Sequence, residues 1–232
     1  GAADPALMHD AQVGYYACIT HLDHQIGRIL QALEREGILH DTIILFCSDH
    51  GELLGDHHTF RKTRAYQGSV HIPLFFRVPQ FKGGMRYDAL ASLEDIMPTL
   101  IELAGGEVPE GLDGLSLCPV MRGEQAGAHA FIHGEHSGGN LSNQYIVTKE
   151  DKYIWYSQTG KELYFDLKSD KIEVNNRMED PSVSQRIKYL RNLLITQLTG
   201  REEGYSDGQN LVIGCKPVTM LSSSHSPDRG NV

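Results

Sequence analysis

The stretch TIILFCSDHGELLGDHHTFRKTRAYQGSVHIPLFFRVP, residues 42–79, carries the clearest structural signal in the chain. It begins with an unbroken apolar run, Ile43 to Cys47, which is rich in β-branched and aromatic residues and too short for an isolated helix. We therefore expect a strand buried on both faces. The run stops at Asp49 and His50. A carboxylate and an imidazole just beyond the carboxyl end of a buried strand occupy the position where open α/β sheets bind ligands.

The segment between this strand and the next apolar run is dense in polar residues. It contains Asp56, His57, His58, Arg61, Lys62 and Arg64. Polar residues at this density, with little apolar periodicity, indicate a site between two core strands. The basic cluster within the segment is compatible with two interpretations, a solvated loop or a positively charged entrance for an anionic substrate.

The order of these residues resembles the second conserved block of the sulfatases of the alkaline phosphatase superfamily. The matching elements are Ser48-Asp49-His50-Gly51-Glu52, Leu54-Gly55-Asp56-His57, Lys62 and Tyr66-Gln67-Gly68-Ser69-Val70-His71-Ile72-Pro73. Two positions depart from the block, because Gln67 stands where Glu is usual and His71 where Arg is usual. The resemblance covers roughly residues 5–195 and corresponds to the second half of the family's pattern.

The resemblance implies roles for residues near the strand end. Asp49 and His50 would be ligands of the active-site divalent metal, and Lys62 would bind a sulfate oxygen. His57 would line the substrate pocket and join Lys62 in catalysis. The remaining residues expected to contact the substrate are His71 and Arg61.

The residue types also fit this chemistry without the family. Hydrolysis of a sulfate or phosphate ester requires stabilisation of charge on non-bridging oxygens, which a metal ion and a nearby ammonium provide. A carboxylate ligand such as Asp49 favours Ca²⁺ or Mg²⁺, whereas an imidazole moves the preference towards Mn²⁺ or Zn²⁺. We expect calcium, with magnesium or manganese as alternatives. The competing interpretation is a polar turn at Asp49 and a solvated charge at Lys62.

The composition is that of a soluble globular protein. The 232-residue chain has 40% hydrophobic and 22% charged residues and a formal net charge of −9. This acidic balance argues against nonspecific nucleic-acid binding. No apolar run approaches the roughly 20 residues that span a bilayer. The first residues lack the features of a signal peptide, which leaves a periplasmic or cytoplasmic location open. Cys18 and Cys47 are expected to be buried thiols.

Local patterns predict the remaining elements. Apolar residues at three- and four-residue steps predict a helix over residues 5–36. Residues 73–79, bracketed by prolines, predict a short strand or an edge strand. A further helix is expected over residues 95–105, four short strands between residues 130 and 166, and a helix over residues 182–198.

These elements predict an α/β fold, part of an alkaline-phosphatase-like sheet with flanking helices. A small antiparallel C-terminal sheet packed with a helix follows. The expected units are the metal-site half of the sulfatase α/β domain at residues 1–127, a small β subdomain with a helix at 128–200, and a polar tail at 201–232. Within the subdomain, His133, Glu135 and His136 are compatible with a substrate-contact loop or a solvated loop.

The family's nucleophile motif, C/S-x-P/A-x-R, is not found in this sequence. Cys118 begins a superficially similar stretch, but Val120 occupies the third position, so Cys118 is not expected to be the nucleophile. The paired aspartates that complete the family's metal site are also not found. We therefore expect a C-terminal part of a sulfatase that acts on a small anionic sulfate ester. Its formylglycine nucleophile would lie on the missing N-terminal half, a possible partner, and the chain alone would be inactive.

Two other functional classes remain open at this point. The Asp49-His50 pair also suits a phosphonate or phosphodiester hydrolase of the same superfamily. A non-catalytic binding module with the same fold is the third possibility.

Overall fold

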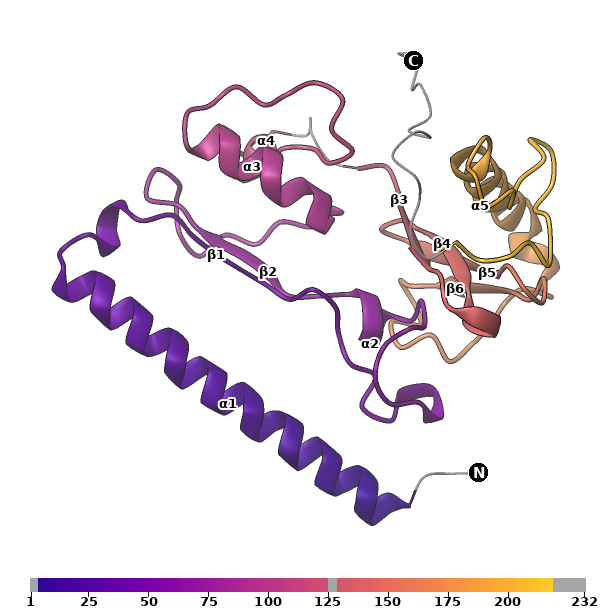
Figure 1. The fold of residues 1–232 in the computed structure, drawn as a ribbon, viewed down its shortest axis with the longest axis horizontal. Coiled ribbons are helices and arrows are strands. Elements are labelled where there is room, and N and C mark those ends of the chain that lie inside the picture. Colours follow the sequence, from indigo (N-terminus) through magenta and orange to yellow (C-terminus); the bar gives the residue numbers. More distant parts are fainter. Residues whose placement is uncertain (1–3, 125–128, 219–232) are drawn as a thin grey trace.

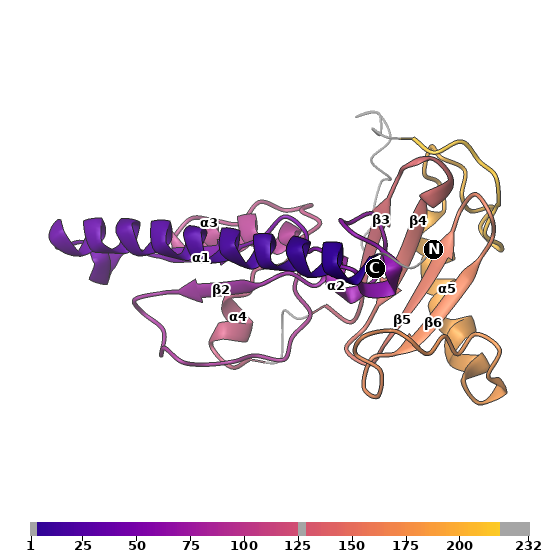
Figure 2. The ribbon, with the colours of Figure 1, turned by 90° about the horizontal axis from the view of Figure 1, so that it is seen from below.

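The computed structural model describes residues 4–124 and 129–218. Within them, an N-terminal part contains helices and a two-stranded sheet, and a C-terminal part contains a four-stranded sheet and a helix (Figure 1). Figure 2 shows the two parts side by side along the long axis of the molecule. The predicted mixture of helices and sheet, with a small antiparallel sheet near the C-terminus, is confirmed. No helix of the described residues is sufficiently long and apolar to cross a bilayer.

Helix α1, Pro5–Arg35, extends over the range that its apolar periodicity predicted. Asp4 caps its start by accepting a hydrogen bond from Ala6 N at 2.9 Å. No residue of α1 is buried, and Ile29 is 62% exposed. Cys18 is exposed as well. The expectation of a buried thiol is therefore wrong, because no described element covers that face of the helix.

Strand β1, Ile44–Cys47, pairs antiparallel with β2, Leu74–Arg77, so that Cys47 lies opposite Leu74. The short strand expected between the two prolines is confirmed by β2. All four residues of β1 are half-buried, Cys47 included. Burial on both faces is therefore a wrong prediction for the described chain, because β1 has a single strand neighbour there and incomplete cover on its faces.

The helices that follow are organised around a buried carboxylate. The side chain of Asp95 accepts hydrogen bonds from Ser92 N at 2.8 Å and from Leu115 N at 2.7 Å. It thereby fixes the start of α3, Ile96–Leu103, to the loop before α4, Cys118–Met121. Cys118 is buried and its pKa is raised chiefly by that burial, which fits a structural thiol.

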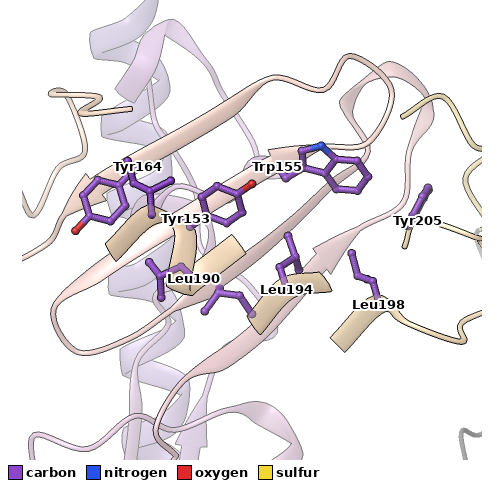
Figure 3. Packing of buried hydrophobic residues seen from close by; sticks show 9 residues of the cluster. Tyr153, Trp155, Tyr164, Leu190, Leu194, Leu198 and Tyr205 are labelled. Atoms are coloured by element: carbon purple, nitrogen blue, oxygen red, sulfur yellow. The ribbon is translucent and has the colours of Figure 1, made fainter. Parts of the chain in front are cut away.

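The C-terminal part is a meander of four antiparallel strands in chain order. The strands are β3, Ile132–His136; β4, Asn143–Val147; β5, Asp151–Tyr156; and β6, Glu162–Asp166. Helix α5, Ser184–Leu198, covers one face of this sheet. Leu190, Leu194 and Leu198 on α5 pack against Tyr153 and Trp155 of β5 (Figure 3).

Part of the segment expected to be a polar tail joins this core. Tyr205 is fully buried and its ring meets Trp155 edge-on, with the ring centroids 5.8 Å apart. The serine-rich end of the expected tail, residues 219–232, lies outside the described residues. The structured C-terminal part therefore extends beyond residue 200.

The opposite face of the same sheet is also covered. Because side chains alternate along a strand, Ile154 and Tyr156 point away from α5. They form a second apolar cluster with Phe165 of β6 and with Ala65, which belongs to the N-terminal part. The segment that carries Lys62 is thus seated on the C-terminal sheet.

Candidate active site

The end of β1 brings three of the predicted site residues together. His50 Nδ1 lies 2.8 Å from the carbonyl oxygen of Gly51, and His50 Nε2 lies 2.5 Å from Lys62 Nζ. A carbonyl only accepts, so Nδ1 carries the proton and Nε2 presents its lone pair to the ammonium. A carboxylate oxygen of Asp49 lies 3.5 Å from the same Nε2. The carboxylate, imidazole and ammonium therefore share one location.

The loop between Asp49 and α2, Gln67–Val70, has an unusual backbone. Five non-glycine residues have positive φ angles: Leu54 (49°), His57 (52°), His58 (56°), Arg61 (70°) and Thr63 (88°). Residues with a side chain rarely adopt positive φ angles unless their surroundings restrain the backbone. The Glu52 carboxylate supplies part of that restraint, because it accepts hydrogen bonds from the backbone N–H groups of Leu54 and Arg61.

The His57 side chain lies against an aromatic ring. Its imidazole stacks on Tyr66, with the ring centroids 3.7 Å apart and the planes 8° from parallel. Tyr66 in turn meets Phe165 edge-on. Burial, followed by the nearby Tyr156, raises the pKa of Tyr66 to about 12. This stack connects the loop to the C-terminal sheet.

An open cleft of about 2040 Å³ runs from the end of β1 to the rim of the C-terminal sheet. Four of the six predicted site residues line it: Asp49, His50, Lys62 and His71. Arg64 of the basic cluster also lines it. His57 and Arg61 are outside this lining, so the described structure does not bring them to the same cavity.

The far wall of the cleft is formed by β3 and β4. His133 lies on β3, where one of the short strands was expected, and Glu135, expected in a loop, lies on the same strand. His133 Nε2 is 2.8 Å from the side-chain oxygen of Gln144, and Glu135 pairs with Arg201 at 2.8 Å. Burial lowers the pKa of His133, which favours the neutral imidazole. The solvated-loop interpretation is therefore wrong for these two residues, because the strand and its partners fix both side chains.

The donors at the strand end suit a divalent cation in kind but are few in number. Asp49 offers carboxylate oxygens, and His50 Nε2 offers a nitrogen whose tautomer the Gly51 carbonyl selects. Among residues 4–124 and 129–218, no group of three or more His, Cys, Asp and Glu side chains is arranged to hold a metal ion. The two donors account for part of a coordination shell.

The structure also reveals residues that sequence reasoning missed. Lys152 on β5 and Glu173 after β6 are buried and hydrogen-bond to residues 65–67, just beyond Lys62. Neither residue was among the predicted site residues. No pattern singled out Lys152, because a lysine in a strand is usually a solvated charge.

The chain is similar in sequence to known proteins. The family model described as Sulfatase matches residues 12–106. An arylsulfatase of Clostridium perfringens is 46% identical over 225 residues, which cover 95% of this chain and 47% of that protein. The chain therefore spans about half the length of this relative.

Solved structures resemble the chain over most of its length. One is described as a complex with its substrate D-glucosamine-2-N,6-O-disulfate; it is 29% identical with a TM-score of 0.69, covering 78% of this chain and 38% of that one. A phosphonate monoester hydrolase of Agrobacterium radiobacter is 30% identical with a TM-score of 0.69, covering 82% and 43%.

These neighbours define the class of the fold, that of the alkaline phosphatase superfamily. Within that class, the chain belongs to the sulfatase family. The resemblance seen in residues 48–73 is confirmed.

Proposed function

We propose that this chain forms part of an enzyme that hydrolyses sulfate esters, with Asp49 and His50 as ligands of a divalent cation and Lys62 as the residue that binds a sulfate oxygen. The observation that supports this most strongly is the meeting of Lys62 Nζ and His50 Nε2 at 2.5 Å beside Asp49, within one cleft. Membership of the sulfatase family supports the choice of ester.

Each residue of the group has a defined task in this proposal. A bound Ca²⁺, Mg²⁺ or Mn²⁺ would polarise the sulfate group and offset its charge. Lys62 binds a non-bridging oxygen through its ammonium and stabilises the charge that develops there. The Gly51 carbonyl holds His50 in the tautomer that places the lone pair on Nε2; this lone pair accepts from Lys62 in the structure and would turn to the cation once Lys62 binds the ester. His71 and Arg64, which line the same cleft, add positive or polar groups facing an anionic substrate.

The nucleophile is proposed to be a formylglycine located outside these 232 residues. Within this sequence the candidate stretch at Cys118 has Val120 at the motif's third position, and Cys118 itself is buried. The chain alone is therefore expected to be inactive. The test compares the 232-residue chain with the longest polypeptide encoded at its natural locus, using 4-nitrophenyl sulfate. Turnover by the chain alone would contradict the proposal, as would a locus that encodes no such motif.

The half of the arylsulfatase relative that the match leaves uncovered suggests a partner for this chain. The arylsulfatase relative extends well beyond the region matched here, since the match covers 47% of it. Helix α1 meanwhile has no buried residue and exposes Leu22 and Ile29. We expect the counterpart of that remaining half to cover α1 and to complete the metal shell.

Metal affinity distinguishes a partial shell from a complete one. Calorimetry of the 232-residue chain with Ca²⁺, Mg²⁺ and Mn²⁺ is expected to give dissociation constants no tighter than about 10⁻³ M, the weak end of protein sites. Asp49→Asn should abolish even that binding, whereas Asp41→Asn, on an exposed turn before β1, should leave it unchanged. Micromolar binding by the chain alone would contradict the partial shell.

A second candidate function is hydrolysis of phosphonate or phosphodiester substrates. The observation that favours it is the similarity to a phosphonate monoester hydrolase, at the same TM-score as the complex with D-glucosamine-2-N,6-O-disulfate. Parallel assays of the longest natural polypeptide with 4-nitrophenyl sulfate and 4-nitrophenyl phenylphosphonate separate the two, since the preferred substrate has the higher kcat/KM.

A further inference from the structure

Lys152 is a fully buried lysine whose charged group faces the site segment. Its side chain points from β5 to the face opposite α5, and its exposed fraction is 0%. Its Nζ donates to the carbonyl of Ala65 at 2.7 Å and to the side-chain oxygen of Gln67 at 2.8 Å. A carboxylate oxygen of Glu173 lies 2.7 Å away. The ammonium therefore donates two hydrogen bonds to residues 65 and 67 and forms an ion pair with Glu173.

Glu173 completes the arrangement from the segment after β6. It is 2% exposed, and its second carboxylate oxygen accepts a hydrogen bond from Gln67 N at 2.5 Å. Its φ angle of 59° is in the left-handed region, which costs energy for a glutamate. Lys152 and Glu173 together therefore hold both the backbone and the side chain of Gln67, the first residue of α2.

A third contact holds the same segment nearer to Lys62. The Asn143 side chain on β4 donates to the carbonyl of Thr63 at 3.2 Å. Ala65 is 1% exposed against the sheet. Lys62 itself lies between Arg61 and Thr63, whose φ angles of 70° and 88° are unfavourable for residues with side chains. A backbone in this conformation persists only when both of its ends are restrained.

The two ends of the Lys62 segment are restrained differently. The Glu52 carboxylate binds Arg61 N from within the same loop. On the other side, the restraint comes from Asn143, Lys152 and Glu173 of the C-terminal part. Buried ion pairs of this kind are expensive to desolvate and are weak contributors to stability. The partners that Lys152 and Glu173 share at residues 65 and 67 point to a role in holding this segment.

We infer that Lys152 and Glu173 are positioning residues for Lys62: from the C-terminal sheet they fix residues 65–67 and thereby keep the Lys62 ammonium at His50 and the mouth of the cleft. Neither residue lines the cleft, so neither contacts substrate. The catalytic consequence rests on the proposed function, because it requires that Lys62 binds the ester. The placement of the Lys62 ammonium at His50 does not depend on the proposed function.

The geometric test uses the 232-residue chain and needs no turnover. Imidazole ¹⁵N spectra of His50 report whether Nε2 accepts a hydrogen bond from Lys62. We expect Glu173→Gln and Lys152→Met to shift the Nε2 signal towards that of a free imidazole, and Lys62→Met, which removes the donor itself, should do the same. Amide spectra of β3–β6 show that the sheet remains folded. If Lys152→Met does not fold, Glu173→Gln, which keeps the size and one acceptor oxygen, gives the result alone.

A matched control comes from an exposed pair in the same part of the molecule. Lys168 Nζ and Glu150 lie 2.6 Å apart, with side chains 64% and 58% exposed. Glu150→Gln removes a carboxylate from an ion pair as Glu173→Gln does, but the Glu150 side chain pairs with Lys168 rather than with residues 61–67, so the His50 signal should be unchanged. An unchanged His50 signal in folded Glu173→Gln, or an equal shift in Glu150→Gln, would overturn the inference.

The catalytic test uses the longest natural polypeptide with 4-nitrophenyl sulfate. Glu173→Gln weakens the contacts that hold Lys62 in place, so kcat/KM should fall by about 10- to 100-fold. This is the size of effect seen when a residue that hydrogen-bonds to a metal ligand is replaced. Glu150→Gln should retain full activity. If the wild-type polypeptide has no sulfatase activity, the proposed function fails while the His50 spectra still decide the positioning role. Full activity in a Glu173→Gln protein with wild-type spectra would contradict the inference.

Discussion

Helices α1 and α5 are both amphipathic, yet they are buried to very different extents. Helix α5 has 15 residues and buries Ile187, Leu190, Leu194, Ile195 and Leu198. Helix α1 has 31 residues and buries none, although its apolar residues recur at the same three- and four-residue steps. The difference lies in the partners, because α5 faces a four-stranded sheet and α1 faces no comparable surface among the described residues. Periodicity therefore predicts a helix but not its burial.

The same contrast separates stability from chemistry. The largest apolar cluster lies between α5 and β5, whereas the proposed catalytic groups lie on a strained loop of the N-terminal part. Substitutions in the two regions should accordingly affect different measurements.

The largest effect is expected from Leu190→Ala on α5. Leu190 is fully buried among aromatic side chains, so the substitution removes apolar contacts and leaves a cavity. The free energy of unfolding should fall by about 3 to 5 kcal/mol. Urea denaturation measures it, with Lys188→Ala on the exposed face of α5 as the control. A loss below about 1 kcal/mol would show that the α5 core is not the stabilising region.

Lys62→Met is expected to lower the catalytic rate and to leave stability almost unchanged. Lys62 is exposed, so the free energy of unfolding should change by less than about 0.5 kcal/mol. In the longest natural polypeptide, kcat for 4-nitrophenyl sulfate should fall by about 10²- to 10³-fold, as when a donor to developing charge is removed. Lys82→Met, a comparable change outside the cleft lining, should preserve activity. Equal kcat values in the two variants would exclude Lys62 from the site.

Lys152, which connects the two regions, should make the free energy of unfolding depend on pH. Burial lowers the pKa of Lys152 to about 8 from 10.5, against the opposing effect of Glu173. Between these values the unfolded chain binds more protons at this group, so its contribution to stability rises with pH. That contribution is fully present above 10.5 and is lost as the pH falls through 8. Another titratable group near the ammonium is Tyr145, whose ring centre lies 5.9 Å from it.

The double variant Lys152→Met/Glu173→Gln isolates this effect. The difference in unfolding free energy between wild type and the double variant should change between pH 7.5 and 9.5, with wild type gaining relative stability at the higher pH. Denaturation in urea at the two pH values measures it. Parallel pH profiles for the two proteins would mean that Lys152 does not titrate in this range.

The smallest effect is expected from Ile29→Ala on α1. With Ile29 62% exposed, the 232-residue chain should lose no more than about 0.5 kcal/mol, close to the effect of Gln31→Ala. In a longer natural polypeptide that covers α1, the loss should rise to about 2 kcal/mol or more. The same small value in both proteins would show that α1 remains uncovered.

Local sequence patterns predicted much of this structure. Local signals predicted where several elements begin and end. Apolar periodicity predicted α1, the flanking prolines predicted β2, and turn residues predicted the strands of the C-terminal sheet. The grouping of Asp49, His50 and Lys62 was accessible through the family's ordered motif. His57 was assigned to the pocket by the same motif, yet its ring stacks on Tyr66 outside the cleft lining, because the backbone turns through positive φ angles there.

The sequence by itself determined the family, the helices and strands, and the residue types that meet at the end of β1. These depend on short-range spacing, which one chain displays directly. Only the tertiary structure decided that Lys152 and Glu173 hold the Lys62 segment, since they lie 85 and 106 residues from Gln67. It also decided which amphipathic helix is buried. Burial and long-range hydrogen bonds depend on what the fold places opposite a residue, and no local pattern encodes that.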